Sequence, residues 1–207
     1  MTRHNAFVLA RAVRAVTLNH YQLQTSCIET SYLFQRVACR FGIAARRMVA
    51  QAHAQSALLA QAVQEGRDLQ ALFGQPGYWA VAVGLPGESE VIGQSDSVRN
   101  RFIGHVVCVI DDGRQQWLVD PSADQMNRPE RGLTIGEPIV ARIPPAAASS
   151  MLVNPDGVRV RYELFPQVRA PMPRTALWLD RAAKELAAGL RLDRVEPAAG
   201  AAGCAAH

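Results

Sequence analysis

The sequence is short of lysine, aromatic residues and cysteine, and it contains no long hydrophobic run. Lys184 is the only lysine, and aromatic residues make up 6% of the 207 residues. No stretch approaches the roughly 20 unbroken apolar residues of a membrane-spanning helix. The first residues also lack the apolar stretch and cleavage site of a secretory signal peptide. We therefore expect a cytoplasmic protein that makes no contact with a membrane.

The four cysteines are Cys27, Cys39, Cys108 and Cys204, and they lie far apart in the chain. None belongs to a CxxC pair, and no cysteine and histidine have the spacing of a zinc site. This spacing predicts neither a disulfide framework nor a metal cluster. We expect no metal and no organic cofactor.

Composition indicates one compact domain rather than two. With 49% hydrophobic and 19% charged residues, the chain can bury one sizeable core. We expect a single domain over residues 1–192, followed by a flexible Ala/Gly-rich tail over 193–207. The formal net charge is +4, and arginine carries almost all of the positive charge. Because the arginines hardly cluster and few aromatics accompany them, nucleic acid is not the expected partner.

Hydrophobic periodicity predicts helices first and then a run of strands. The predicted helices cover 5–20, 27–41, 56–73 and 176–192, and the predicted strands cover 43–52, 77–85, 103–110, 116–120, 138–143 and 158–165. Residues 86–101, which are rich in Gly, Ser, Glu and Asp, predict a long loop. This order is typical of an α+β domain with a mostly antiparallel sheet.

Cys27 lies at the predicted start of the second helix. Ser26, followed three residues later by Glu29, forms a capping box there. Cys27 would then lie beside unpaired backbone N–H groups and the positive end of the helix dipole, both of which stabilise a thiolate. One face of the helix, which should meet the sheet, carries Cys27, Ser31, Phe34, Ala38 and Phe41. Cys27 is therefore a candidate nucleophile; the alternative is a buried structural cysteine.

A predicted hairpin places a histidine beside a carboxylate. Asp112-Gly113 between two strand-like runs is typical of a two-residue type I′ turn. With that turn, His105 lies directly opposite Asp120, on the same face and with Cβ atoms about 4.5–5.5 Å apart. A three-residue loop would instead place Asp120 on the other face. Taken singly, His105 is also compatible with a satisfied core histidine, and Asp120 with a turn former before Pro121.

These segments resemble the transglutaminase-like branch of the papain-like cysteine enzymes. The run from Cys27 to Phe41, followed by Gly42-Ile43-Ala44-Ala45-Arg46, is similar to that family's nucleophile helix and its Gly-Ile-Pro-Ala-Arg strand entry, with Ala44 in place of proline. His105 with its apolar strand, then Trp117 and Asp120-Pro121-Ser122, is similar to the family's histidine strand and Trp-x-x-x-Asp-Pro-Thr strand. The order Cys, His, Asp also agrees.

The resemblance implies a papain/transglutaminase-like core in which the nucleophile helix packs on the sheet. It implies a Cys27-His105-Asp120 triad that acts on amide, peptide or thioester bonds of a peptide, protein or small acyl substrate, either as a hydrolase or as an amine acyltransferase. Related enzymes recruit a glutamine or an indole N–H as a second oxyanion donor, which makes Gln24 and Trp79 candidates. Both residues also have ordinary interpretations, loop solvation for Gln24 and core packing for Trp79.

Two other interpretations stay open. The chain also shares its triad order with arylamine acetyltransferases, although the arginine and glycines that follow their cysteine are absent here. The alternative from another class is a binding or interaction module that keeps the transglutaminase-like fold without turnover.

Overall fold

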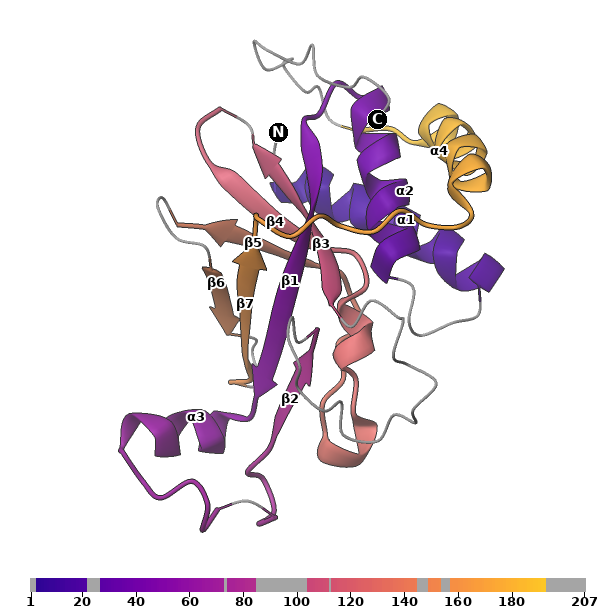
Figure 1. Cartoon of the computed structure of the whole chain (residues 1–207). Coiled ribbons are helices and arrows are strands. Elements are labelled where there is room, and N and C mark those ends of the chain that lie inside the picture. Colours follow the sequence, from indigo (N-terminus) through magenta and orange to yellow (C-terminus); the bar gives the residue numbers. More distant parts are fainter. Residues whose placement is uncertain are drawn as a thin grey trace.

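A curled antiparallel sheet forms the centre of the molecule, and three helices cover one of its faces (Figure 1). The computed structural model describes residues 3–21, 27–72, 74–84, 104–111, 113–144, 149–153 and 157–192. The helices are α1 (Arg3–Tyr21), α2 (Cys27–Arg40), α3 (Ala57–Gln64) and α4 (Ala176–Gly189). The strands are β1 (Ala45–Gln55), β2 (Ala80–Val83), β3 (His105–Asp111), β4 (Gln116–Asp120), β5 (Ile139–Ile143), β6 (Ser149–Val153) and β7 (Arg159–Phe165).

The sheet has the strand order β5-β4-β3-β1-β7-β6, and every pair with a recorded register is antiparallel. On one edge, β1 pairs with β3 over Ala45–Ala50 and then with β2 over Ala52–Gln55. On its other edge, β1 pairs with β7 over Val49–Gln55. The end of β2 and the start of β3 therefore meet along the edge of one long strand.

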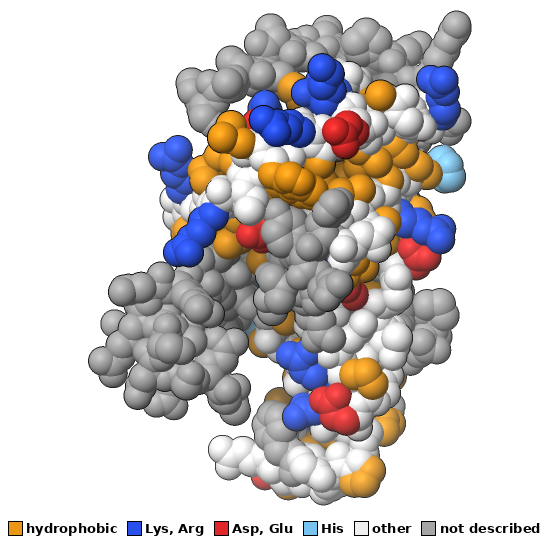
Figure 2. Space-filling model, turned by 90° about the vertical axis from the view of Figure 1, so that its right-hand side faces the viewer, with side chains coloured by type: hydrophobic (Ala, Val, Ile, Leu, Met, Phe, Trp, Pro, Cys, Tyr) orange, Lys and Arg blue, Asp and Glu red, His pale blue; other side chains and the backbone are white. Residues whose placement is uncertain are grey.

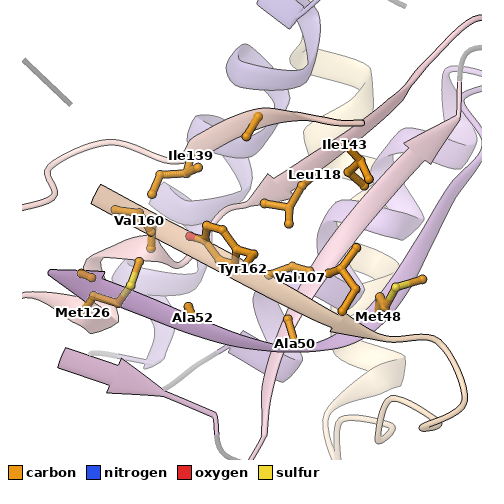
Figure 3. Packing of buried hydrophobic residues seen from close by; sticks show 14 of the residues in the cluster. Met48, Ala50, Ala52, Val107, Leu118, Met126, Ile139, Ile143, Val160 and Tyr162 are labelled. Carbon is orange, nitrogen blue, oxygen red and sulfur yellow. The ribbon is translucent and has the colours of Figure 1, made fainter. Parts of the chain in front are cut away.

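Both faces of the sheet are buried, because side chains alternate along each strand. On β3, Val107 and Val109 join a core enclosed by the curl of the sheet itself, shown in Figure 3. Cys108 and Ile110 join a second core beneath α1, α2 and α4. An almost continuous apolar strand such as β3 is the sequence consequence of burial on both sides.

The predicted elements are largely confirmed. Helices α1, α2 and α4 and strands β1, β3, β4, β5 and β7 lie where periodicity placed them. Helix α3 is shorter than predicted, since it ends at Gln64 before Gly66 adopts a φ of 66°. Strand β6 was not predicted. The predicted loop over 86–101 and the tail over 193–207 lie outside the described residues.

The predicted β3–β4 register is wrong. Asp111 pairs with Gln116 rather than with Arg114, so the loop spans residues 112–115 and not two residues. His105 therefore does not lie directly opposite Asp120. Because the shift is by two residues, the assignment of side chains to faces survives.

Cys39 is disulfide-bonded, whereas Cys27 and Cys108 are free thiols. The spacing of the cysteines did not predict this bond. Within the described ranges, no helix is long and apolar enough to cross a membrane. No group of three or more His, Cys, Asp or Glu side chains in that part of the chain is arranged to hold a metal ion.

Candidate functional site

Cys27 is the first residue of α2 and is partly exposed. The helix is fixed against the sheet by fully buried Phe34, Val37 and Ala38 and by a hydrogen bond from the Cys108 thiol to the Ser31 carbonyl, 3.3 Å long. This contact lies one helical turn after Cys27 and three residues after His105. The first residues of α2 and β3 therefore lie at the same end of the sheet. The N-cap residue Ser26 and Gln24 lie outside the described residues.

His105 and Asp120 form a buried pair. The His105 Nε2 and Asp120 Oδ2 atoms are 2.8 Å apart, and the two side chains are 1% and 0% exposed. In the observed register, Asp120 continues the ladder opposite Val107 rather than His105. The two side chains share a face and meet diagonally, which is within reach of a long side chain.

Asp120 accepts hydrogen bonds on both of its oxygens. Oδ2 accepts from the Tyr162 hydroxyl at 2.8 Å as well as from His105. Oδ1 accepts from the Ser122 backbone N–H at 3.0 Å and from the Ser122 hydroxyl at 3.2 Å. One oxygen therefore closes the turn at Asp120-Pro121-Ser122 while the other holds the imidazole. Four donors make a buried carboxylate tolerable where an unpaired one would be very costly.

Tyr162 reaches this carboxylate from β7, although β1 and β3 lie between β7 and β4 in the strand order. The inner face of β1 carries Ala50, Ala52 and Ala54, and Ala52 is the residue paired with Tyr162. Figure 3 shows the Tyr162 ring in the middle of the hydrophobic core inside the curl of the sheet, beside the small side chains of β1. Because alanines leave the space above β1 open, the ring can lie there with its hydroxyl directed at Asp120. The pKa of Tyr162 is raised well above 10.0 by burial and by the charge of Asp120.

The electrostatics of the pair favour imidazolium and carboxylate. Burial, the largest influence, lowers the pKa of His105, but the charge and hydrogen bond of Asp120 and then the side chain of Cys27 raise it to about 10. Burial likewise raises the pKa of Asp120, but the charge and hydrogen bond of His105 and then the bonds from Tyr162 and Ser122 lower it overall. The raised pKa of His105 favours the protonated ring at neutral pH.

Cys27, His105 and Asp120 are together called the Cys27 cluster, and Cys27 is its third member. Its hydrogen bond and charge both contribute to the raised pKa of His105. The Nδ1 atom of His105 is buried and has no hydrogen-bond partner among the described residues. Helix α2 packs on the face opposite to that of Val107 and Val109.

Gly84 packs closely against the first residue of β3. It follows β2 with a φ of 76°, and a Cβ placed on it would lie 2.2 Å from the His105 backbone nitrogen and 2.6 Å from the His105 Cβ. Only glycine accommodates both that φ and that approach without strain. The end of β2 thus packs directly against the backbone of the histidine.

Trp79 does not lie beside Cys27, His105 and Asp120. It packs against the core inside the curl of the sheet and precedes Ala80, which pairs with Gln55. His105 pairs with Ala50, five residues away along β1, or about 17 Å. This placement favours the core-packing interpretation of Trp79.

Sequence reasoning missed Tyr162, Ser122 and Gly84. Only Ser122 carried a local signal, since serine two residues after aspartate is typical of an Asx turn. It also missed the ion pair at 2.5 Å between Arg14 of α1, 6% exposed, and Asp124. Asp124 lies in a short 3-10 helix (Ala123–Met126) just after Asp120, so this pair fixes that segment to α1.

The chain matches no known protein-family model, no curated protein and no solved structure. The chemistry of the cluster must therefore be argued from its geometry.

Proposed function

We propose that this protein is a cysteine-dependent acyl-processing enzyme of the transglutaminase-like type, acting on amide, peptide or thioester bonds. One observation carries the proposal. A partly exposed thiol at a helix start interacts with an imidazole whose Nε2 is bonded to a buried carboxylate. Nucleophile, acid–base group and orienting group are the three parts that thiol-based acyl transfer requires.

In the first half-reaction, the Cys27 thiolate attacks the acyl carbon. The backbone N–H of Cys27, at the start of α2, is a natural donor to the oxygen that becomes negative. As the bond to the leaving group breaks, the His105 imidazolium gives that group its proton. The products are an acyl thioester on Cys27 and a neutral imidazole.

In the second half-reaction, water or an amine attacks the thioester carbonyl. His105 removes a proton from the attacking group, and the sulfur departs as thiolate. The acid or amide product leaves, and the thiolate–imidazolium pair is restored. Asp120 stays ionised throughout and holds the ring in one orientation.

The transglutaminase-like resemblance supports the same assignment. It implies a nucleophile helix packed on an antiparallel sheet, with the histidine and the aspartate on neighbouring strands, and α2, β3 and β4 have that arrangement. The alternative is a module that keeps this cluster without turnover. Reactivity of Cys27 and formation of an acyl-enzyme separate the two.

The first test is alkylation with iodoacetamide at pH 6, followed by mass spectrometry of the native protein. We expect Cys27 to react at least about tenfold faster than Cys108, because thiolate rather than thiol is the nucleophile. Cys108 is fully buried, and burial raises the pKa of its thiol. Cys27→Ser is the blank, and Asp120→Asn, which removes the charge that holds His105 protonated, should slow the labelling. Equally slow labelling of every free thiol would refute the proposal.

The same samples, incubated with p-nitrophenyl acetate, test for turnover. The enzyme should release p-nitrophenol and carry an acetyl group on Cys27, and neither should occur in Cys27→Ala. A reactive Cys27 that never acquires an acetyl group would favour the silent module instead.

A further inference from the structure

A cavity of about 560 Å³ lies away from the cluster, between α2, the start of β1 and the connection from β7 to α4. In Figure 1 this connection crosses in front of β1 and α2 before it reaches α4. The volume falls within the usual range for small-molecule sites. Four arginines line the cavity: Arg36, Arg46, Arg47 and Arg169.

Among the residues that the structure describes, Arg36 is the one of these four arginines that has an acidic partner. Arg36 forms an ion pair with Asp180 at 2.6 Å. Within the part of the chain that the structure describes, no carboxylate forms an ion pair with Arg46, Arg47 or Arg169. Since arginine stays charged at neutral pH, the described lining of the cavity concentrates positive charge, and of its arginines only Arg36 has a described carboxylate partner.

Arg47 is the best-fixed of the three. One terminal nitrogen donates to the Pro171 carbonyl at 2.7 Å, another lies 3.1 Å from the Met172 sulfur, and the guanidinium stacks 5.1 Å from the centre of the Tyr32 ring. Its Nε atom is buried and has no hydrogen-bond partner among the described residues. Burial lowers the pKa of Arg47 overall; the side chains of Cys108 and Tyr32 act to raise it, and the charge of Arg169 lowers it.

These contacts orient Arg47 but do not compensate its charge. A half-buried cation next to a second cation is costly unless an anion joins it. Arg46 and Arg169 are exposed and flank the same cavity. A fixed guanidinium with further guanidinium groups beside it matches the geometry of phosphate recognition.

We propose that this cavity binds the phosphate group of a small phosphorylated molecule. A phosphate is favoured over a single carboxylate because it brings close to two negative charges and more acceptor oxygens to three unpaired cations. The cavity is a different site from the Cys27 cluster, because none of Cys27, His105 and Asp120 lines it; along α2 its lining runs from Tyr32, five residues after Cys27, to Cys39, twelve residues or about 18 Å after it. The inference does not depend on the proposed acyl chemistry.

The test is isothermal titration calorimetry of the full chain with inorganic phosphate at constant ionic strength. We expect saturable binding to one site, weakened at least tenfold in the double variant Arg46→Gln/Arg169→Gln. Both substituted side chains are exposed, so the fold should persist, which circular dichroism can verify. Arg181→Gln, an exposed arginine on α4, changes charge without touching the cavity and should bind like the wild type.

Absence of binding, or equal weak binding in all variants, would overturn the proposal. Succinate that binds as tightly as phosphate would overturn the choice of phosphate. Iodoacetamide labelling of Cys27 in the double variant should match the wild type. The two proposals can therefore fail separately.

Discussion

At the scale of single residues, Asp120 connects the parts of the candidate site. Its Oδ2 atom binds His105 and Tyr162, and its Oδ1 atom binds Ser122. The carboxylate is thus held from three different parts of the chain: β3, β7 and the turn that follows β4. Its orientation, and through it that of His105, is set by the folded core rather than by local sequence.

Tyr162→Phe should destabilise the protein by about 1.5–3 kcal/mol, the usual cost of losing a hydrogen bond to a buried charged group. Tyr32→Phe is the matched control, because it also removes a hydroxyl bonded to an aspartate, here partly exposed Asp180 at 3.2 Å. We expect that variant to lose less than about 1 kcal/mol. Urea denaturation followed by circular dichroism measures both. Equal losses would show that Tyr162 gives Asp120 no special support.

The sequence alone was sufficient to predict those site residues that carry a local signal. Cys27 at a helix start, and His105 and Asp120 on one hairpin face, follow from capping and alternation. Tyr162 is 42 residues from Asp120, and nothing in its neighbourhood indicates where its hydroxyl points. Such a contact arises from the order of strands in the sheet, which a single sequence does not specify.

At the scale of elements, the junction of β2 and β3 along β1 sets the position of His105. Strand β2 ends at Val83, and Gly84 packs on the backbone of the first residue of β3. The pairing of His105 with Ala50 is preserved only while this space stays free of a side chain.

Gly84→Ala should therefore displace the start of β3 and slow the alkylation of Cys27 at least about tenfold. Gly132→Ala is the control, because Gly132 has a similar φ of 73° but open space around its Cβ position. It should cost only about 1–2 kcal/mol of backbone strain and leave labelling unchanged. Thermal unfolding and the iodoacetamide rate are measured for both variants. Normal labelling in Gly84→Ala would show that this contact does not position His105.

Element types were easier to predict than their connections. The Asp112-Gly113 pair favours a two-residue turn, yet Asp111 pairs with Gln116. The error is harmless to the site because a shift by two residues keeps every side chain on its face. A shift by one residue would have separated His105 from Asp120, so the prediction of faces was correct although the prediction of opposed partners was wrong.

At the scale of the whole molecule, one sheet separates two cores, and the candidate site draws on both: Tyr162, which holds Asp120, belongs to one core, and the buried side chains of α2 belong to the other. The face shown in Figure 2 has its Lys and Arg side chains scattered among apolar, neutral and acidic ones. Among the described residues on that face, the basic side chains form no continuous patch of the kind that binds nucleic acid.

The buried pair should make global stability depend on pH. The folded pKa of His105, about 10, exceeds its unfolded value of 6.5, so its contribution is complete below pH 6.5 and is lost as the pH rises toward 10. The pKa of Asp120 is lowered from 3.8, so its contribution is lost as the pH falls below that value. The free energy of unfolding should therefore decline between pH 6.5 and 9.

Asp120→Asn is the comparison for this pH dependence, because without that charge burial lowers the pKa of His105. The variant should show no decline over the same range, measured by urea denaturation at each pH. The range stops at pH 9, since the buried Cys108 thiol, whose pKa is raised from 9.0, adds its own dependence above it. Parallel curves for the two proteins would contradict the assigned charges.

The most direct measurement is the protonation state of His105, followed by nitrogen-15 NMR of the histidine rings and assigned with a His105→Gln variant. The account predicts a ring that stays protonated above pH 8 in the wild type and loses its proton at a lower pH in Cys27→Ala, because the sulfur no longer supports the charge. A His105 that is neutral at pH 7, or one that titrates identically with and without the Cys27 sulfur, would contradict it.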